Sequence, residues 1–236
     1  MYIADRSVLS LYASGRTRGI VAHLGADAGY VGAIEGGRGL AQAIYCFNVP
    51  GEDLDKFLMR MLEERGYSCT KESEGEVVRG IKEKVCYVAE DVGEEMKRGP
   101  PERLCELPDG QLIAIGKERF LCPEALFEPS LIGYESNGLH ECIHSTILRS
   151  DDYLRDDLSS NIVLSGGCSM LPGIAARVQK EVYLLGLPAK MIVPKERKNA
   201  VWLGGSILSS LPIFQQIWTT KECYDESGPW IVSRKF

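Results

Sequence analysis

The segment at residues 161–182 limits the possible folds more than any other part of this chain. It reads NIVLSGGCSMLPGIAARVQKEV: an apolar stretch that ends at Leu164, then Ser165-Gly166-Gly167, then apolar residues at helical spacing. A short apolar run before a glycine turn is typical of a buried strand, and the periodic run after it is typical of a helix. A strand joined to a helix by so short a turn predicts a mixed fold, α/β or α+β.

Other segments predict the same mixture of strands and helices. A helix is predicted over 53–66, where Asp53 would cap the start and Gly66 would end it, and a second helix over 74–91. The segment CELPDGQLIAIG predicts a hairpin that turns at Pro108-Asp109-Gly110. The apolar faces of the two helices comprise Leu54, Phe57, Leu58, Met61 and Leu62 in the first, and Val77, Val78, Ile81, Val85 and Val88 in the second. The remaining predicted elements are a strand or short helix before Gly15, a buried strand beginning at Gly19, and an apolar segment over 201–218.

Composition excludes several classes of protein. The chain has 236 residues, of which 44% are hydrophobic, and a net charge of -6. An acidic balance argues against nucleic acid or an anionic membrane surface as the main partner. We find no apolar run long enough to span a bilayer and no signal-peptide pattern, so an intracellular protein is expected. The eight cysteines form no C-x-x-C pair and are expected to be reduced thiols, not a disulfide frame or a zinc site.

Two features indicate a pocket, and each has a structural alternative. Backbone N–H groups in the turn Ser165-Gly166-Gly167 could face an anion, or the glycines could serve only the tight connection. Arg79, Lys82 and Glu83 share one helix face, where they could line a pocket or form a solvated charged surface. His140 and His144 are four residues apart but lack a third metal ligand, so no metal site is expected.

The segment GIVAHLGADAGY, residues 19–30, has the form of a phosphate-binding turn. An apolar run precedes Gly25 and Gly29, as in loops that present polar side chains to a nucleotide. Here the positions that would face a ligand are occupied by His23, Leu24, Ala26 and Ala28. The segment therefore looks like a phosphate loop that has lost its polar side chains.

Several long motifs together resemble actin. They include MYIADRSVLSLYASGRTRGIV, ERGYSCTKESEGEVVRGIKEKVCYVAED, ELPDGQLIAIGKERFLCPEALFEPS, LSGGCSMLPGIAARVQKE, VPKERKNAVWLGGSILSSL and YDESGPWIVSRKF. The similarity extends from Met1 to Phe236 with only short gaps. It implies an actin-like fold of the ribonuclease H-like (ASKHA) type, which is an α/β fold.

The resemblance also implies a subdomain organisation. Met1 aligns well inside the family's sequence, so about the first third of that sequence, with its first phosphate loop, has no counterpart here. We expect residues 1–13 to form a hinge segment, 14–49 and 135–199 an inner subdomain, and 50–134 an outer subdomain. Residues 200–236 would be a tail that joins the missing subdomain.

The phosphate end of the family's nucleotide site departs from the pattern. The aspartates that organise the metal's water shell and the hydrolytic water correspond to His23 and Ala26. The family's serine between them is Leu24, its histidine is Tyr30, and the hinge glutamine that positions water is Arg6. Phosphoryl transfer depends on such positioning and on metal and electrostatic stabilisation, so we expect no ATPase activity.

The base end is closer to the family's pattern, although Cys168 and Leu171 replace a threonine and a tyrosine. We therefore expect no bound cofactor, with weak ATP or ADP binding as the alternative. An inherited helix with no ligand would explain the charged residues equally well. The residues that match the family's adenine and ribose contacts are Gly51, Arg79, Lys82, Glu83, Gly167, Met170 and Lys198.

Two surfaces resemble partner sites of the family. The loop FEPSLIGYESNG resembles a longitudinal-contact loop, with Leu131, Ile132 and Tyr134 as its apolar residues, although it could also be a surface turn tucked against its own domain. Tyr12, Leu208 and Leu211 match a cleft for amphipathic helices. We expect a non-catalytic structural or interaction protein of the cytoplasm and cytoskeleton that binds actin or actin-like proteins. The alternatives are a weak nucleotide-binding protein that co-polymerises with or caps actin-type filaments, and a poorly folding relic.

Overall fold

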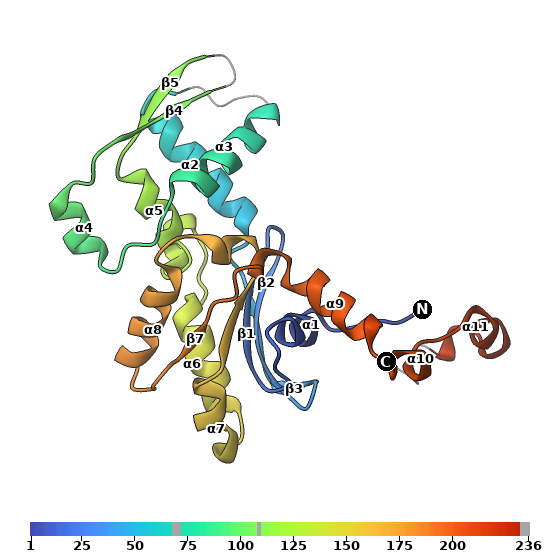
Figure 1. Ribbon diagram of the computed structural model, residues 1–236. Coiled ribbons are helices and arrows are strands. Elements are labelled where there is room, and N and C mark those ends of the chain that lie inside the picture. The colour runs from blue at the N-terminus through green and yellow to red at the C-terminus, as the bar shows by residue number, and fades with distance from the viewer. Residues whose placement is uncertain (68–71, 108–109, 232–236) are drawn as a thin grey trace.

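The structure is a computed structural model that describes residues 1–67, 72–107 and 110–231. Strands and helices alternate along the chain, as the sequence predicts (Figure 1). The strands are β1 (Gly19–Leu24), β2 (Gly29–Glu35), β3 (Arg38–Phe47), β4 (Arg103–Glu106), β5 (Leu112–Ile115), β6 (Ile162–Ser165) and β7 (Met191–Ile192). The α-helices are α1 (Arg6–Ala13), α2 (Gly51–Glu64), α3 (Glu72–Val85), α4 (Val92–Arg98), α5 (Glu118–Glu124), α6 (Leu139–Arg149), α7 (Asp152–Ser159), α8 (Ile174–Leu184), α9 (Ala200–Ser210), α10 (Phe214–Ile217) and α11 (Lys221–Ser227). Short 3-10 turns are η1 (Pro129–Ile132), η2 (Gly167–Met170) and η3 (Arg197–Asn199).

A five-stranded mixed sheet in the order β3-β2-β1-β6-β7 is the centre of the fold. The strands β1, β2 and β3 form an antiparallel meander, whereas β6 pairs in parallel with both β1 and β7. In the parallel register Ile20 lies opposite Ile162, and His23 lies opposite Ser165. The carboxyl ends of β1 and β6 therefore meet at one edge of the sheet, which is where open α/β sheets bind ligands.

The central strand β1 is buried along its whole length, because helices cover both faces of the sheet. Alternate side chains point to opposite faces, so Ile20, Ala22 and Leu24 belong to one apolar cluster and Val21 to another. The smaller cluster lies against α1, and the larger one lies against α6 and α8 (Figure 1).

The helices α2 to α5 and the hairpin of β4 and β5 gather beyond the carboxyl edge of the sheet (Figure 1). The predicted hairpin is confirmed, although its turn residues 108–109 lie outside the described residues. Both predicted helices are also confirmed, with corrected bounds. The first begins at Gly51 after Pro50, so Asp53 is not its cap, and the second ends at Val85, before Val88. The subdomain boundaries stay a prediction.

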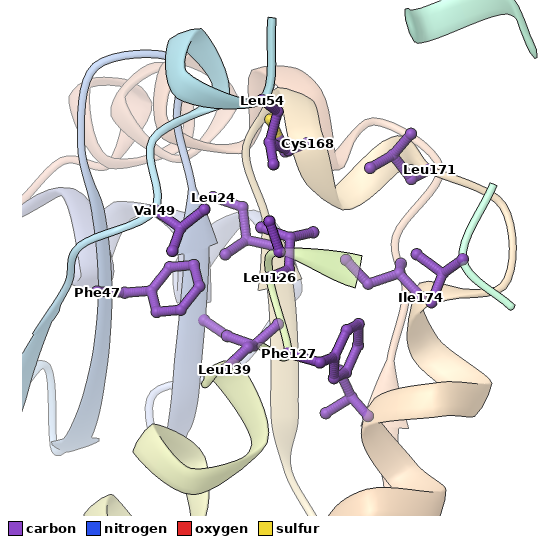
Figure 2. Close-up of a cluster of buried hydrophobic side chains, with 14 of the residues drawn as sticks. Leu24, Phe47, Val49, Leu54, Leu126, Phe127, Leu139, Cys168, Leu171 and Ile174 are labelled. Carbon is purple, nitrogen blue, oxygen red and sulfur yellow. The ribbon is translucent and has the colours of Figure 1, made fainter. Parts of the chain in front are cut away.

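One continuous apolar core joins this group of helices to the sheet. Leu24 and Phe47 from the sheet meet Leu54 of α2, Leu126, which follows α5, and Ile174 of α8 (Figure 2). Since all these side chains belong to a single buried cluster, the sheet and the helices above it fold around a shared core.

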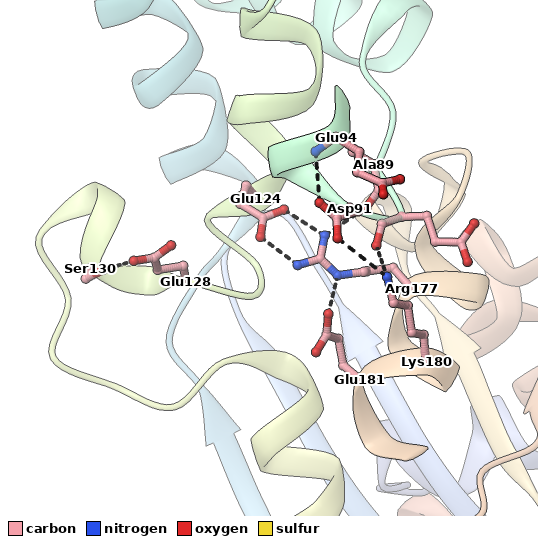
Figure 3. Close-up of polar contacts among 10 residues, drawn as sticks. Ala89, Asp91, Glu94, Glu124, Glu128, Ser130, Arg177, Lys180 and Glu181 are labelled. Carbon is pink, nitrogen blue, oxygen red and sulfur yellow. Dashed lines mark hydrogen bonds and ion pairs between the residues drawn. The ribbon is translucent and has the colours of Figure 1, made fainter. Parts of the chain in front are cut away.

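A polar cluster provides a second link. The Arg177 guanidinium of α8 makes a two-pronged bond to Glu124 of α5, with N–O distances of 2.8 and 3.1 Å, and also pairs with Glu181 at 2.7 Å (Figure 3). The same guanidinium donates to the Ala89 carbonyl and lies 4.8 Å above the centre of the Phe127 ring. The buried cation therefore connects three segments that are distant in sequence.

The predicted apolar tail forms α9 and α10. Helix α9 packs along α1, while α10 and α11 lie beyond it, away from the sheet (Figure 1). The crossing of α1 and α9 depends on Gly204, because a Cβ atom there would lie 1.8 Å from the Leu9 carbonyl oxygen. Helix α11 contains no buried residue.

Candidate functional site

A cavity of about 610 Å³ opens at the carboxyl ends of β1 and β6. Its wall comes from the turn between β1 and β2, the first turns of α2, one face of α3, and the segments η2 and η3. The lining residues are His23, Gly25, Ala26, Asp27, Gly51, Asp55, Arg79, Lys82, Glu83, Gly166, Gly167, Cys168, Met170, Leu171, Lys198 and Asn199.

All seven residues predicted for the base end of a nucleotide site line this cavity. They come from four different elements: Gly51 from α2; Arg79, Lys82 and Glu83 from α3; Gly167 and Met170 from η2; and Lys198 from η3. The fold thus brings them together over large sequence separations. Whether they contact a ligand stays a prediction.

The two glycines after β6 have different structural roles. Gly166 has a φ of +91°, and a Cβ atom there would lie 2.4 Å from the carbonyl oxygen of Leu24 on β1. Its role is therefore the tight connection of neighbouring strands. A Cβ atom on Gly167 would meet no atom within 4 Å, so this glycine leaves the cavity open.

Backbone donors around the turn between β1 and β2 are bound to other backbone groups. The Gly25 N–H donates to the Ala28 carbonyl at 3.1 Å, which closes the turn. The first N–H groups of α2, those of Gly51 and Glu52, donate to the carbonyls of Gly25 and Ala26 at 3.0 and 2.9 Å. The Gly166 N–H donates to the Arg197 carbonyl at 2.9 Å. These four donors are therefore unavailable to an anion.

His23, which replaces an aspartate of the phosphate loop, is built into the protein interior. Its side chain is 9% exposed and stacks on the ring of Tyr30, with centroids 4.9 Å apart and an angle of 11°. Its Nδ1 atom lies 3.1 Å from the hydroxyl of Ser165, which in turn lies 3.0 Å from the hydroxyl of Ser10. Burial, aided by the nearby charge of Arg6, lowers the pKa of His23 to about 4. The imidazole is therefore neutral at physiological pH.

Each cation that lines the cavity has a carboxylate partner in the same wall. Lys82 is almost fully buried, and its Nζ atom lies 2.7 Å from Asp55 and donates to the Gly51 carbonyl at 2.8 Å. Arg79 pairs with the same Asp55 at 3.3 Å, and Lys198 pairs with Glu83 at 3.3 Å. With Asp27 included, the lining side chains carry three positive and three negative charges.

Comparison with known protein families identifies the family of this chain. The family model described as Actin matches residues 1–236. The chain belongs to the actin family. The mixed sheet and its surrounding helices are consistent with an actin-like fold, as the sequence predicts.

The resemblance to actin implies a nucleotide with a divalent metal ion, and the phosphate end of this cavity does not fit that group. The Ala26 side chain has no oxygen that could order a metal's water shell, and the His23 ring lies within hydrogen-bond distance of Ser165 and stacks on Tyr30. Among the described residues, no group of three or more His, Cys, Asp or Glu side chains is arranged to hold a metal ion. The base end differs, because Glu83 and Lys198 are about half exposed and therefore free to rearrange around a hydroxyl or a ring nitrogen.

The residues of the predicted longitudinal-contact loop lie partly against their own domain. Leu131 and Ile132 are half-buried and pack on the apolar core, and the Leu131 carbonyl accepts a bond from Arg60. Tyr134 is more exposed, although its hydroxyl donates to Asp53. The loop is thus a docked turn with one aromatic ring at the surface.

The other predicted partner residues differ in accessibility. Leu208 is buried and Tyr12 is half-buried, whereas Leu211, at the end of α9, is exposed. Trp202 on the same helix is 74% exposed, and Ile213 and Trp218 follow with exposed side chains. The accessible apolar surface of the tail therefore lies at Trp202, at Ile207 and beyond Leu208. No helix in the described ranges is both long and apolar enough to cross a bilayer.

Two features of the site were missed from the sequence. Asp55 lies three residues before Leu58 and seven before Leu62, on the buried face of α2, which was a detectable signal for a paired carboxylate. The bond between His23 and Ser165 joins residues 142 positions apart and had no local signal.

Proposed function

We propose that this protein is a non-catalytic member of the actin family that acts by binding other proteins. The observation that carries the proposal is His23, a neutral and buried imidazole where the family pattern has an aspartate. Phosphoryl transfer needs groups that position the metal, the phosphates and the attacking water. A stacked imidazole bonded to Ser165 supplies none of these.

A phosphate-release assay with purified protein, magnesium and ATP tests this proposal. We expect no release above that of heat-inactivated protein. The matched variant is Gly167→Leu, which fills the cavity without meeting any neighbouring atom at its Cβ position. Phosphate release that exceeds the heat-inactivated control and is abolished by this variant contradicts the proposal.

The protein-binding role is supported by the tail. Several large apolar side chains of α9 and the following segment face solvent, and Trp230 is 82% exposed. Complete burial of a fully exposed apolar side chain contributes roughly 1.5–3 kcal/mol, so each of these partly exposed side chains contributes part of that when a partner covers it. Large exposed apolar patches mark interaction sites on monomeric proteins, and exposed apolar side chains are numerous in this tail. The proposed partner is actin or an actin-like protein of the cytoskeleton, which contributes an amphipathic helix to this surface.

Co-sedimentation with purified actin tests the tail directly. Replacing both Leu211 and Ile213 with aspartate should abolish binding, because both side chains are exposed and a charge at a buried interface is costly. Leu104→Asp on β4 is the control, since Leu104 is 71% exposed but lies outside the tail. If the unaltered protein binds neither actin nor itself and takes up no apolar dye, the tail is not a binding surface.

A second candidate function is weak binding of an adenine nucleoside moiety. It is favoured by one observation, the convergence of all seven predicted base-end residues on a single cavity. The expected site would use Glu83 and Lys198 for the ribose and base, and the apolar side chains of Met170 and Leu171 for packing.

A further inference from the structure

The phosphate end of the cavity carries a negative charge of its own. Of the five residues at 25–29, only Asp27 is charged, and its exposed side chain lines the cavity. No ion pair joins Asp27 to a cation within the described part of the chain. This carboxylate therefore faces any ligand group that reaches the turn between β1 and β2.

Several potential donors around Asp27 are already bound to other groups. The N–H groups of Gly25, Gly51 and Gly166 donate to backbone carbonyls. Lys82 and Arg79 are held by Asp55, and Lys82 also donates to the Gly51 carbonyl, so moving either toward an anion would leave a nearly buried carboxylate with less compensation.

One further cation lies outside the lining. The guanidinium of Arg6 is 5.4 Å from the centre of the Tyr30 ring, and its charge favours the neutral form of His23. Because Arg6 does not belong to the cavity wall, it does not replace the missing contacts to phosphate.

The other end of the cavity has different chemistry. Glu83 and Lys198 form a solvent-accessible pair at 3.3 Å that can exchange partners with a hydroxyl group or a ring nitrogen. Leu171 and Cys168 are buried in the cavity wall and supply an apolar surface, with the Cys168 Sγ atom 4.0 Å from the Gly25 carbonyl oxygen. In the orientation that the resemblance to actin implies, the cavity presents this wall to a flat, hydroxyl-bearing ligand and the Asp27 carboxylate to the tail of that ligand.

We propose that the cavity selects a nucleoside whose 5′ end is neutral or positively charged over the corresponding nucleoside phosphates. This inference rests on the second candidate function, the residual nucleoside site, and reverses the charge preference that the family resemblance implies. The determinant is Asp27, which repels a phosphate and attracts an ammonium group. Two unit charges about 4 Å apart in a water-like medium change affinity about fivefold.

Calorimetric titration with a series of ligands tests the proposal. The series is adenosine, 5′-amino-5′-deoxyadenosine, AMP, ADP and ATP, the last three with and without magnesium. We expect the protonated amine to bind about fivefold more tightly than adenosine, and AMP to bind more weakly by a similar factor. Gly167→Leu should abolish binding of all of them, which places the ligand in this cavity.

Asp27→Asn should remove the advantage of the amine and the penalty on AMP while adenosine binds as before. The matched control is Glu63→Gln on α2, an exposed carboxylate that does not line the cavity and should change none of these ratios. Equal melting temperatures of the variants show that the fold is kept.

The outcomes separate this inference from the proposed function. Tighter binding of AMP than of adenosine, an unchanged amine preference in Asp27→Asn, or no binding of any nucleoside overturns the inference. None of these results bears on whether the protein is catalytic, because the phosphate-release assay tests that proposal separately.

Discussion

Replacing Gly204 with alanine should force α1 and α9 apart. A Cβ atom at this position would lie 1.8, 2.5 and 2.9 Å from the O, C and Cα atoms of Leu9. All three belong to backbone, so no change of side-chain rotamer relieves the clash. The two helices must separate by about 1.2 Å before the closest contact reaches 3.0 Å.

The expected cost follows from that separation. A gap of 0.5–1 Å forfeits about a quarter to a half of each dispersion contact, and overpacked sites lose roughly 1–3 kcal/mol. Alanine also gains about 1 kcal/mol over glycine in a helix interior. We therefore expect Gly204→Ala to lower the free energy of unfolding by up to about 2 kcal/mol.

The neighbouring residue is a matched control. A Cβ atom at Gly205 would meet only the Leu9 Cδ1 atom, at 3.9 Å, which is an ordinary contact. Gly205→Ala should keep the helix gain and be neutral or stabilising by up to about 1 kcal/mol. The two single variants should differ by about 2 kcal/mol, or roughly 4–8 °C in melting temperature.

Thermal denaturation followed by circular dichroism measures this difference, and limited proteolysis shows whether α9 is released. Faster cleavage beyond residue 200 in Gly204→Ala alone would support displacement of the tail from α1. Equal melting temperatures for the two alanine variants would refute the close crossing of α1 and α9.

Three further predictions concern buried ionisable groups. Asp55→Ala should leave the almost fully buried Lys82 ammonium with less compensation and lower the free energy of unfolding, measured by urea denaturation, by about 3–5 kcal/mol. Asp55→Leu combined with Lys82→Met should approach the stability of the unaltered protein. Equal losses of stability in the single and the double variant would contradict the pairing. The folded pKa of His23 is about 4, below its ordinary 6.5, so the unfolded chain binds more protons between these values and stability should fall by up to about 3 kcal/mol as the pH drops through that window. His23→Phe should flatten this slope and His144→Asn should not, as measured by melting temperature against pH; a slope unchanged in His23→Phe would argue against a neutral buried imidazole. Arg177→Met should lower the free energy of unfolding by about 3–5 kcal/mol, because Glu124 is left buried without its partner. Arg177→Lys should have intermediate stability, because lysine keeps the charge but loses the two-pronged bond. A stability of Arg177→Lys equal to that of the unaltered protein would contradict the role of that bond.

Much of the fold could be predicted because its signals are local. The strand, glycine turn and following helix of 161–182 are read from apolar spacing within a few residues, and so are α2, α3 and the hairpin of β4 and β5. The ends of the helices were predicted less accurately from the sequence. The sequence suggested Asp53 as a cap, but Pro50 fixes the chain direction one turn earlier and α2 begins at Gly51.

The sequence by itself therefore determined the class of fold, the family, and which side chains replace the phosphate-loop aspartates. It did not determine what those replacements do. Only the assembled sheet places His23 opposite Ser165, and only the packing of α2 against α3 brings Asp55 to Lys82. The tail shows the same division. Its apolar character can be predicted from the sequence. The packing of α9 on α1 determines that Leu208 is buried, while Trp202 and Leu211 are exposed to solvent. The physical reason is range, since turn and helix preferences act between near neighbours, whereas burial and ion pairing depend on segments that meet only in the folded chain.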